Sequence, residues 1–156
     1  MYKRQTGIIG GAYMLFVAFF AMIFGTIVDR NRKHTVMLLS SVISAVAFLI
    51  AGVLYVWQPE SALLDLGGPW FWLFSAIILF GGVIEQLRNI ALSTTVTLLV
   101  PEDRRANANG LVGTVQGLAF LVTSVFSGLS IGFLGMGWTL AIAIGAMVLT
   151  LSLIHI

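Results

Sequence analysis

Four long apolar runs constrain the fold of this chain more than any other feature. An α-helix needs about 20 apolar residues, at about 1.5 Å each, to cross a hydrocarbon core about 30 Å thick. A fifth run is too short to span alone, and the runs lack the period-2 alternation of a membrane barrel. The sequence therefore predicts an all-α, multi-pass membrane bundle with helices at 7–28, 35–57, 70–100, 109–133 and 138–150.

Composition supports a bilayer as the solvent of this chain. Only 9% of the residues are charged, whereas about a quarter are charged in an ordinary globular protein. A soluble all-α domain with these runs would have almost no polar surface. The charges lie in short clusters between apolar runs, which suits membrane-surface loops better than a nucleic-acid partner.

The sequence lacks the residue patterns that are typical of metal sites, disulfide frameworks and enzyme active sites. The chain has no Cys, and its two histidines, His34 and His155, are far apart. No disulfide framework, metal site or cofactor is therefore expected. No nucleophile arrangement or phosphate-binding loop is present, so we expect no catalytic residues and no enzyme.

The two ends resemble translated adapter DNA. The string CTGTCTCTTATACACATC, a transposase adapter used in library preparation, encodes the final LSLIHI, and its complementary strand encodes the initial MYKRQ. We therefore expect residues 1–5 and 151–156 to be non-native and the native segment to be 6–150. Lys3 and Arg4 lie in the first of these ends, so the remaining six basic residues balance six acidic ones.

The connections between the runs alternate in charge. The segments DRNRKH and PEDRRANAN hold five Lys or Arg, and QPESALLDLGGP and LGMGW hold none. The positive-inside rule places the two basic loops, 29–34 and 101–108, in the cytoplasm. Tryptophans then fall at the outer helix ends, where an aromatic belt is expected: Trp57, Trp70, Trp72 and Trp138.

The first basic loop resembles the hallmark of the major facilitator superfamily of transporters, G-x-x-x-D-R-x-G-R-R. Gly25, Asp29, Arg30 and Lys33 stand in register, followed by His34. Arg32 replaces the turn glycine, unless a one-residue deletion aligns Arg32 and Lys33 with the final basic pair. The resemblance implies a loop that takes part in gating against the second half of the transporter.

The physical chemistry of these positions fits such a gate. Gly25 has no side chain, so another helix can approach closely, and Asp29 one turn later can meet the positive N-terminus of that helix. A plainer interpretation needs only the basic residues, as a signal for membrane orientation. Both interpretations stay open on the sequence alone.

The resemblance covers most of residues 7–150, as the second to the sixth helix of a major facilitator N-terminal half. The segment from Leu99 to Trp138 is similar to macrolide-efflux-type members. That similarity implies proton-coupled efflux of hydrophobic drugs from a bacterial cell membrane. The expected partners are the lipid bilayer, a small hydrophobic substrate, protons and the missing C-terminal half. The stretch TSVFSG keeps Gly128 but lacks the proline of many antiporters.

Two charges lie well inside the third run. Glu85 and Arg88 are three residues apart and so share a helix face, with Gln86 and Asn89 beside them. A charge at the bilayer centre costs about 2.5–3.5 kcal/mol on insertion scales, so it normally faces a partner or a wet cavity. We expect this face to line the substrate and proton pathway. Glu85 would exchange a proton, and Arg88 would either influence that exchange or hold an anionic group. The alternative is a permanent ion pair that only packs helices.

Glycines recur along the fourth run and predict close helix packing, with substrate contact as the alternative. They are Gly113, Gly117, Gly128 and Gly132. Phe16, Phe19, Phe20 and Met22 are candidates for an adaptable apolar pocket. A rival for the whole chain is a small membrane scaffold or assembly subunit that transports nothing.

Overall fold

The computed structural model describes the backbone of residues 2–154 and the side chains of residues 7–135, 137–146 and 149. The described residues form helices and no strand: α1 (Tyr2–Arg30), α2 (Lys33–Trp57), α3 (Glu60–Leu64), α4 (Pro69–Leu99), the 3₁₀ helix η1 (Glu102–Arg104) and α5 (Arg105–Ile154). Four segments are long and apolar enough to cross a membrane: Gly7–Arg30, Lys33–Trp57, Pro69–Leu99 and Glu102–Gly135. The predicted all-α, multi-pass class is confirmed. The side chains of both suspected adapter segments lie outside the described residues.

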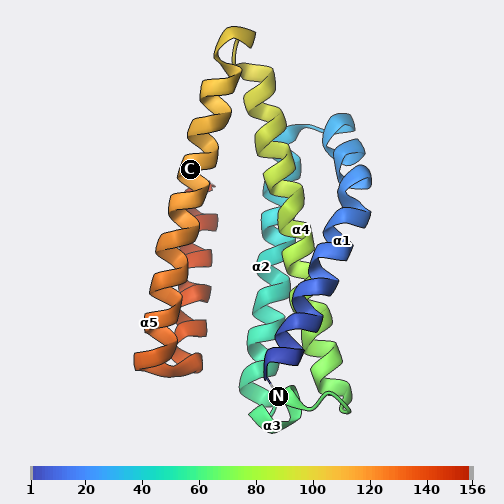
Figure 1. Ribbon diagram of the computed structural model, residues 1–156, viewed down its shortest axis with the longest axis vertical. Coiled ribbons are helices and arrows are strands. Elements are labelled where there is room, and N and C mark those ends of the chain that lie inside the picture. Colours follow the sequence, from blue (N-terminus) through green and yellow to red (C-terminus); the bar gives the residue numbers. More distant parts are fainter. Residues whose placement is uncertain (1, 155–156) are drawn as a thin grey trace. The chain divides into compact units, whose positions relative to one another are not determined.

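The chain divides into two compact units, Met1–Ala91 and Leu92–Ile156. In the first unit, α1, α2 and most of α4 lie side by side (Figure 1). The α2–α4 contact is close because small residues line it. The Ser44 hydroxyl donates a buried 2.9 Å hydrogen bond to the Gly81 carbonyl. A Cβ built on Gly81 would lie 3.0 Å from the Phe48 ring and 3.3 Å from Ala47 Cβ.

A small apolar core lies where α1 ends and α2 begins. Val28, Val36 and Ala91 are buried there. Met37, Leu87 and Ile90 pack against them. Since Val28 and Val36 flank the basic loop, this core fixes the loop against α4.

The connection between α2 and α4 contains the short helix α3, which the sequence reasoning treated only as a loop. Leu63 of α3 is buried, and the chain then turns at Asp65. The Asp65 carboxylate accepts a 3.0 Å hydrogen bond from the Gly67 amide, an arrangement typical of Asx turns. Trp72 Nε1 donates a 3.0 Å hydrogen bond to the Leu66 carbonyl, which ties this turn to the start of α4.

In the second unit, α5 reverses direction at a glycine. Gly135 has φ +81° and ψ 170°, inside a segment otherwise assigned as one helix. Figure 1 shows the chain turning back at the bottom of α5. The Thr139 hydroxyl donates a hydrogen bond to the Gly135 carbonyl at 2.9 Å and can accept one from the buried Ser130 hydroxyl at 3.0 Å. This turn lies in LGMGW, the predicted connection between the fourth and fifth runs.

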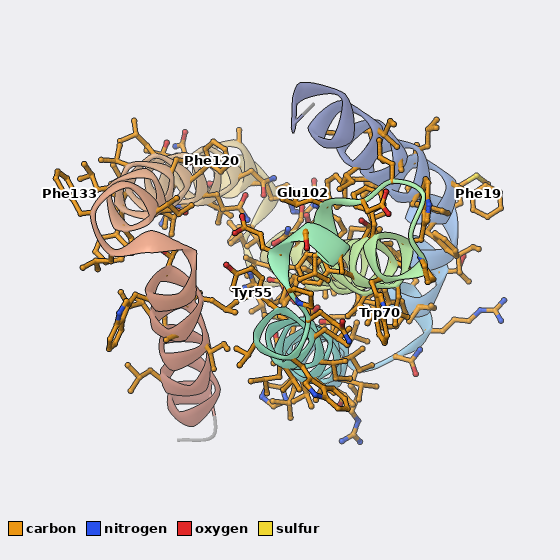
Figure 2. The ribbon with its side chains drawn as sticks, turned by 90° about the horizontal axis from the view of Figure 1, so that it is seen from below. Phe19, Tyr55, Trp70, Glu102, Phe120 and Phe133 are labelled. Atoms are coloured by element: carbon orange, nitrogen blue, oxygen red, sulfur yellow. The ribbon has the colours of Figure 1, made fainter. Side chains whose placement is uncertain are left out.

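Large apolar side chains cover the exposed surfaces of the long helices. Phe19, Phe120 and Phe133 are 72%, 75% and 83% exposed, and Figure 2 shows Phe19 pointing away from α2 and α4. Such surfaces are unfavourable in water and favourable in lipid. The fold therefore matches the bilayer environment that composition predicted.

Candidate functional site

The polar face of α4 holds an ion pair between Glu85 and Arg88. Arg88 Nε donates to Glu85 Oε1 one helical turn away. The two side chains remain 32% and 39% exposed. The pair is therefore neither buried in a helix interface nor fully open, so either partner can still contact a ligand.

A second polar chain joins α4 to α1 beside this pair. Gln86 Nε2 donates a 2.5 Å hydrogen bond to the Tyr13 hydroxyl. Asn89 Nδ2 donates to Gln86 Oε1 at 3.4 Å. Gly82 makes room for this contact, because a Cβ there would lie 3.3 Å from the Tyr13 ring.

Tyr13 is a residue that the sequence reasoning missed. It is the one tyrosine among several phenylalanines in the apolar run 7–28, so its own surroundings give no signal. The available signal was the Gly81–Gly82 pair just before Glu85, which indicates that neighbouring helices approach α4 there.

Glu85 and Tyr13 line one groove among the three helices of the first unit. Its volume is about 520 Å³. The groove is otherwise apolar, with walls from Ile9, Gly10, Phe48, Ile78, Leu79 and Gly82. A carboxylate and a phenol in such walls can bind an apolar molecule that carries one polar group.

The basic loop has a defined capping role. Lys33 Nζ donates to the carbonyls of Val28 at 2.6 Å and Asp29 at 3.2 Å. Asn31 Nδ2 donates to the Ile27 carbonyl at 2.8 Å. These bonds satisfy the carbonyls that the end of α1 leaves without helical partners.

The other charged residues of that loop point to solvent. Asp29, Arg30 and Arg32 are exposed, and no ion pair is found for them among the described side chains. A Cβ on Gly25 would meet no described atom within 4 Å. The surface from Gly25 to Arg32 is thus open to another protein segment.

The comparisons with known proteins decide the family. The sequence model of the Major Facilitator Superfamily matches residues 1–156. The chain belongs to the Major Facilitator Superfamily. No curated protein and no solved structure gives a significant match. As a major facilitator protein, it is a multi-pass membrane transporter.

The structure brings some of the residues predicted for this major facilitator protein together and not others. Glu85, Gln86, Arg88 and Asn89 lie on one α4 face with two hydrogen-bonded pairs. Four α5 glycines are exposed, and a Cβ on each would meet no described atom within 4 Å: Gly113, Gly117, Gly128 and Gly132. Among the described residues, no group of three or more His, Cys, Asp or Glu is placed to hold a metal ion.

The apolar residues that the sequence singled out on α1 divide between two environments. Phe16 and Phe20 line a groove between α1 and α4. Phe19 and Met22 are 72% and 84% exposed and do not line it. Two of the four predicted pocket residues therefore lie at a concave surface.

Proposed function

We propose that this chain is part of the N-terminal half of a proton-driven exporter of hydrophobic drugs of the macrolide type, with Glu85 as the proton carrier. The observation that supports the proposal best is the position of Glu85, half-exposed on an apolar groove of about 520 Å³. An acidic side chain in this setting can meet both a proton and a hydrophobic substrate.

The ion pair supplies two states for such a carrier. A charge inside the bilayer costs about 2.5–3.5 kcal/mol, and an adjacent opposite charge offsets part of that cost. While Glu85 is ionised, it pairs with Arg88. Once Glu85 takes up a proton, the attraction to Arg88 falls, and the guanidinium is free to hold an anionic group or water. Protonation thus changes which groups face the groove.

The Tyr13–Gln86–Asn89 chain can transmit that change between helices. Gln86 is next to Glu85 on α4 and bonds to Tyr13 on α1. A movement of α4 during the transport cycle would therefore act on α1 through this bond. Since α1 leads directly to the basic loop, this bond would connect the proposed pathway with the loop.

The basic loop is proposed as the gate against the missing C-terminal half. Gly25 has an uncovered surface and Asp29 has an exposed carboxylate, which suits a helix N-terminus from that half. Arg30 and Arg32 would pair with its acids, and the loops 29–34 and 101–108 would lie in the cytoplasm of a bacterial cell. The exposed α5 glycines are proposed as contacts with further helices.

The test of the proton role uses the full-length transporter with Glu85→Gln. Glutamine keeps the size and polarity of the side chain but cannot exchange a proton. We expect substrate binding to persist and proton-driven accumulation in inverted membrane vesicles to be lost. Glu60→Gln, at an exposed glutamate of α3, is the matched control and should leave transport unchanged. Normal proton coupling in the Glu85→Gln protein would remove Glu85 from the mechanism.

The partial-half proposal is tested separately at the native gene. Sequencing across both ends of the reading frame should find one more apolar segment upstream and a second bundle downstream. A frame that begins at Met1 and ends at Ile156 would contradict the adapter interpretation. It would favour a small oligomeric membrane protein, the scaffold alternative.

A further inference from the structure

A second groove in the first unit contains a buried hydroxyl that has no partner. This groove has a volume of about 410 Å³ and lies between α1 and α4. Its walls are Ile8, Ile9, Ala12, Phe16 and Phe20 of α1 with Trp72, Ser75, Ala76, Leu79, Phe80 and Val83 of α4. Ser75 is 4% exposed, and its hydroxyl is the buried side-chain polar atom that lacks a hydrogen-bond partner among the described residues.

An unpaired buried hydroxyl needs an explanation. Serine in a helix usually satisfies its hydroxyl with a carbonyl one turn earlier, as Thr26, Thr97 and Thr114 do here. A hydroxyl left unpaired in apolar surroundings destabilises a fold. The Ser75 hydroxyl is therefore placed where a ligand acceptor would satisfy it.

The position of the groove in the membrane indicates the class of ligand. Trp72 stands at the predicted outer interface, and Ser75 lies about 5 Å further along α4 at 1.5 Å per residue. From Trp72 to Val83 the groove follows α4 for about 16 Å, and beyond Ser75 its α4 wall is entirely apolar. A long apolar channel that begins with a hydrogen-bond donor near the interface has the polarity pattern of a membrane lipid.

We infer that this groove binds one acyl chain of a membrane lipid, whose ester carbonyl accepts a hydrogen bond from the Ser75 hydroxyl. The acyl chain lies along the apolar walls towards Phe20 and Val83, and the lipid headgroup stays at the level of Trp72. The site is separate from the proposed proton pathway, because Glu85, Arg88 and Tyr13 do not line it. The inference does not rest on drug export or on proton coupling.

The experiment compares an ester lipid with its ether analogue on the full chain. Dioleoyl phosphatidylglycerol carries ester carbonyls, and the dialkyl ether lipid with the same headgroup carries none. Retention of each lipid by the chain purified in detergent is measured by native mass spectrometry across a lipid titration. We expect the ester lipid to bind about fivefold more tightly, the ratio expected from one neutral hydrogen bond.

The matched variants show whether Ser75 is the donor. Ser75→Ala should bind both lipids with the affinity that the unchanged chain has for the ether lipid. Without lipid, the same variant should be more stable to heat, since it removes the unpaired hydroxyl. Ser93→Ala, at an exposed serine of the same helix outside the groove, should keep the ester preference. Equal binding of both lipids by the unchanged chain, or an ester preference that survives in Ser75→Ala, overturns the inference.

Discussion

Gly81→Ala tests whether the α2–α4 contact depends on the absence of one side chain. The new Cβ would lie 3.0 and 3.1 Å from two carbons of the Phe48 ring and 3.3 Å from Ala47 Cβ. Ordinary contacts between carbon atoms lie at about 3.5–4.0 Å. The Phe48 ring can turn towards the groove that it lines, but the Ala47 methyl group cannot rotate away, so relief shifts the ring and moves α2 and α4 apart by a few tenths of an ångström.

The expected loss follows from three contributions. Overpacking of this kind typically costs about 1–3 kcal/mol. Separation of the helices also weakens the Ser44–Gly81 hydrogen bond, which is worth about 1 kcal/mol. Alanine restores about 1 kcal/mol through its higher helix propensity. The last two contributions nearly cancel, so Gly81→Ala should lower the free energy of unfolding by about 1–3 kcal/mol.

Thermal unfolding of the chain in detergent measures this loss. For a chain of this size, about 1–3 kcal/mol corresponds to a Tm decrease of roughly 2–12 °C. Gly25→Ala is the matched control, because a Cβ there would meet no described atom within 4 Å, and it should not lower Tm. Phe48→Leu in the Gly81→Ala background should recover part of the loss. A Gly81→Ala protein with unchanged or higher Tm would refute the reasoning.

Two further predictions concern the ends of helices. Lys33→Met removes the ammonium that bonds to the Val28 and Asp29 carbonyls and should lower the free energy of unfolding by about 1 kcal/mol. Arg32→Met, at a side chain that makes no capping hydrogen bond, should change it by less than about 0.5 kcal/mol; equal losses in both variants would contradict the cap. Gly135→Ala should cost about 1–3 kcal/mol, because φ +81° and ψ 170° suit glycine almost alone. Gly137→Ala is its control, and both are read by chemical unfolding in detergent; a Gly135→Ala protein as stable as the Gly137→Ala control would remove the strain argument.

The length of an apolar run was sufficient to predict the four long apolar helices, because a bilayer forces backbone groups to bond within the segment. The run 35–57 corresponds to α2, Lys33–Trp57, and the run 70–100 to α4, Pro69–Leu99. Helix α3 was not predictable in the same way. Its five residues, ESALL, carry no period, and the buried position of Leu63 depends on the tertiary fold.

The candidate site was predictable only in part, for a similar reason. The i, i+3 spacing of Glu85 and Arg88 predicts their contact, since one helix determines both positions. The contact of Gln86 with Tyr13 joins residues 73 positions apart. This contact depends on how α1 and α4 pack, and no local sequence pattern predicts that packing. Ser75 resembles any other helical serine in the sequence, and only the structure shows that its hydroxyl lacks a partner.

One basic residue near each of the two predicted cytoplasmic loops has a second role that joins topology to stability. Lys33 Nζ bonds to the Val28 carbonyl at 2.6 Å, and Arg105 Nε bonds to the Val100 carbonyl at 3.1 Å. In both cases, a cation five residues later in the chain meets a carbonyl at the C-terminal end of the preceding long helix. That end carries the negative pole of the helix dipole.

This arrangement explains why the two roles occur in the same residues. A helix that runs from outside to inside ends at the cytoplasmic surface, where its last carbonyls need donors and where the positive-inside rule places Lys and Arg. One cation can satisfy both requirements, so its removal should weaken the helix end as well as the orientation signal. In the first loop, Lys33 is committed to the cap, which leaves exposed Asp29, Arg30 and Arg32 for contact with another segment. The hallmark therefore divides by position into a residue that ends α1 and residues that face outward.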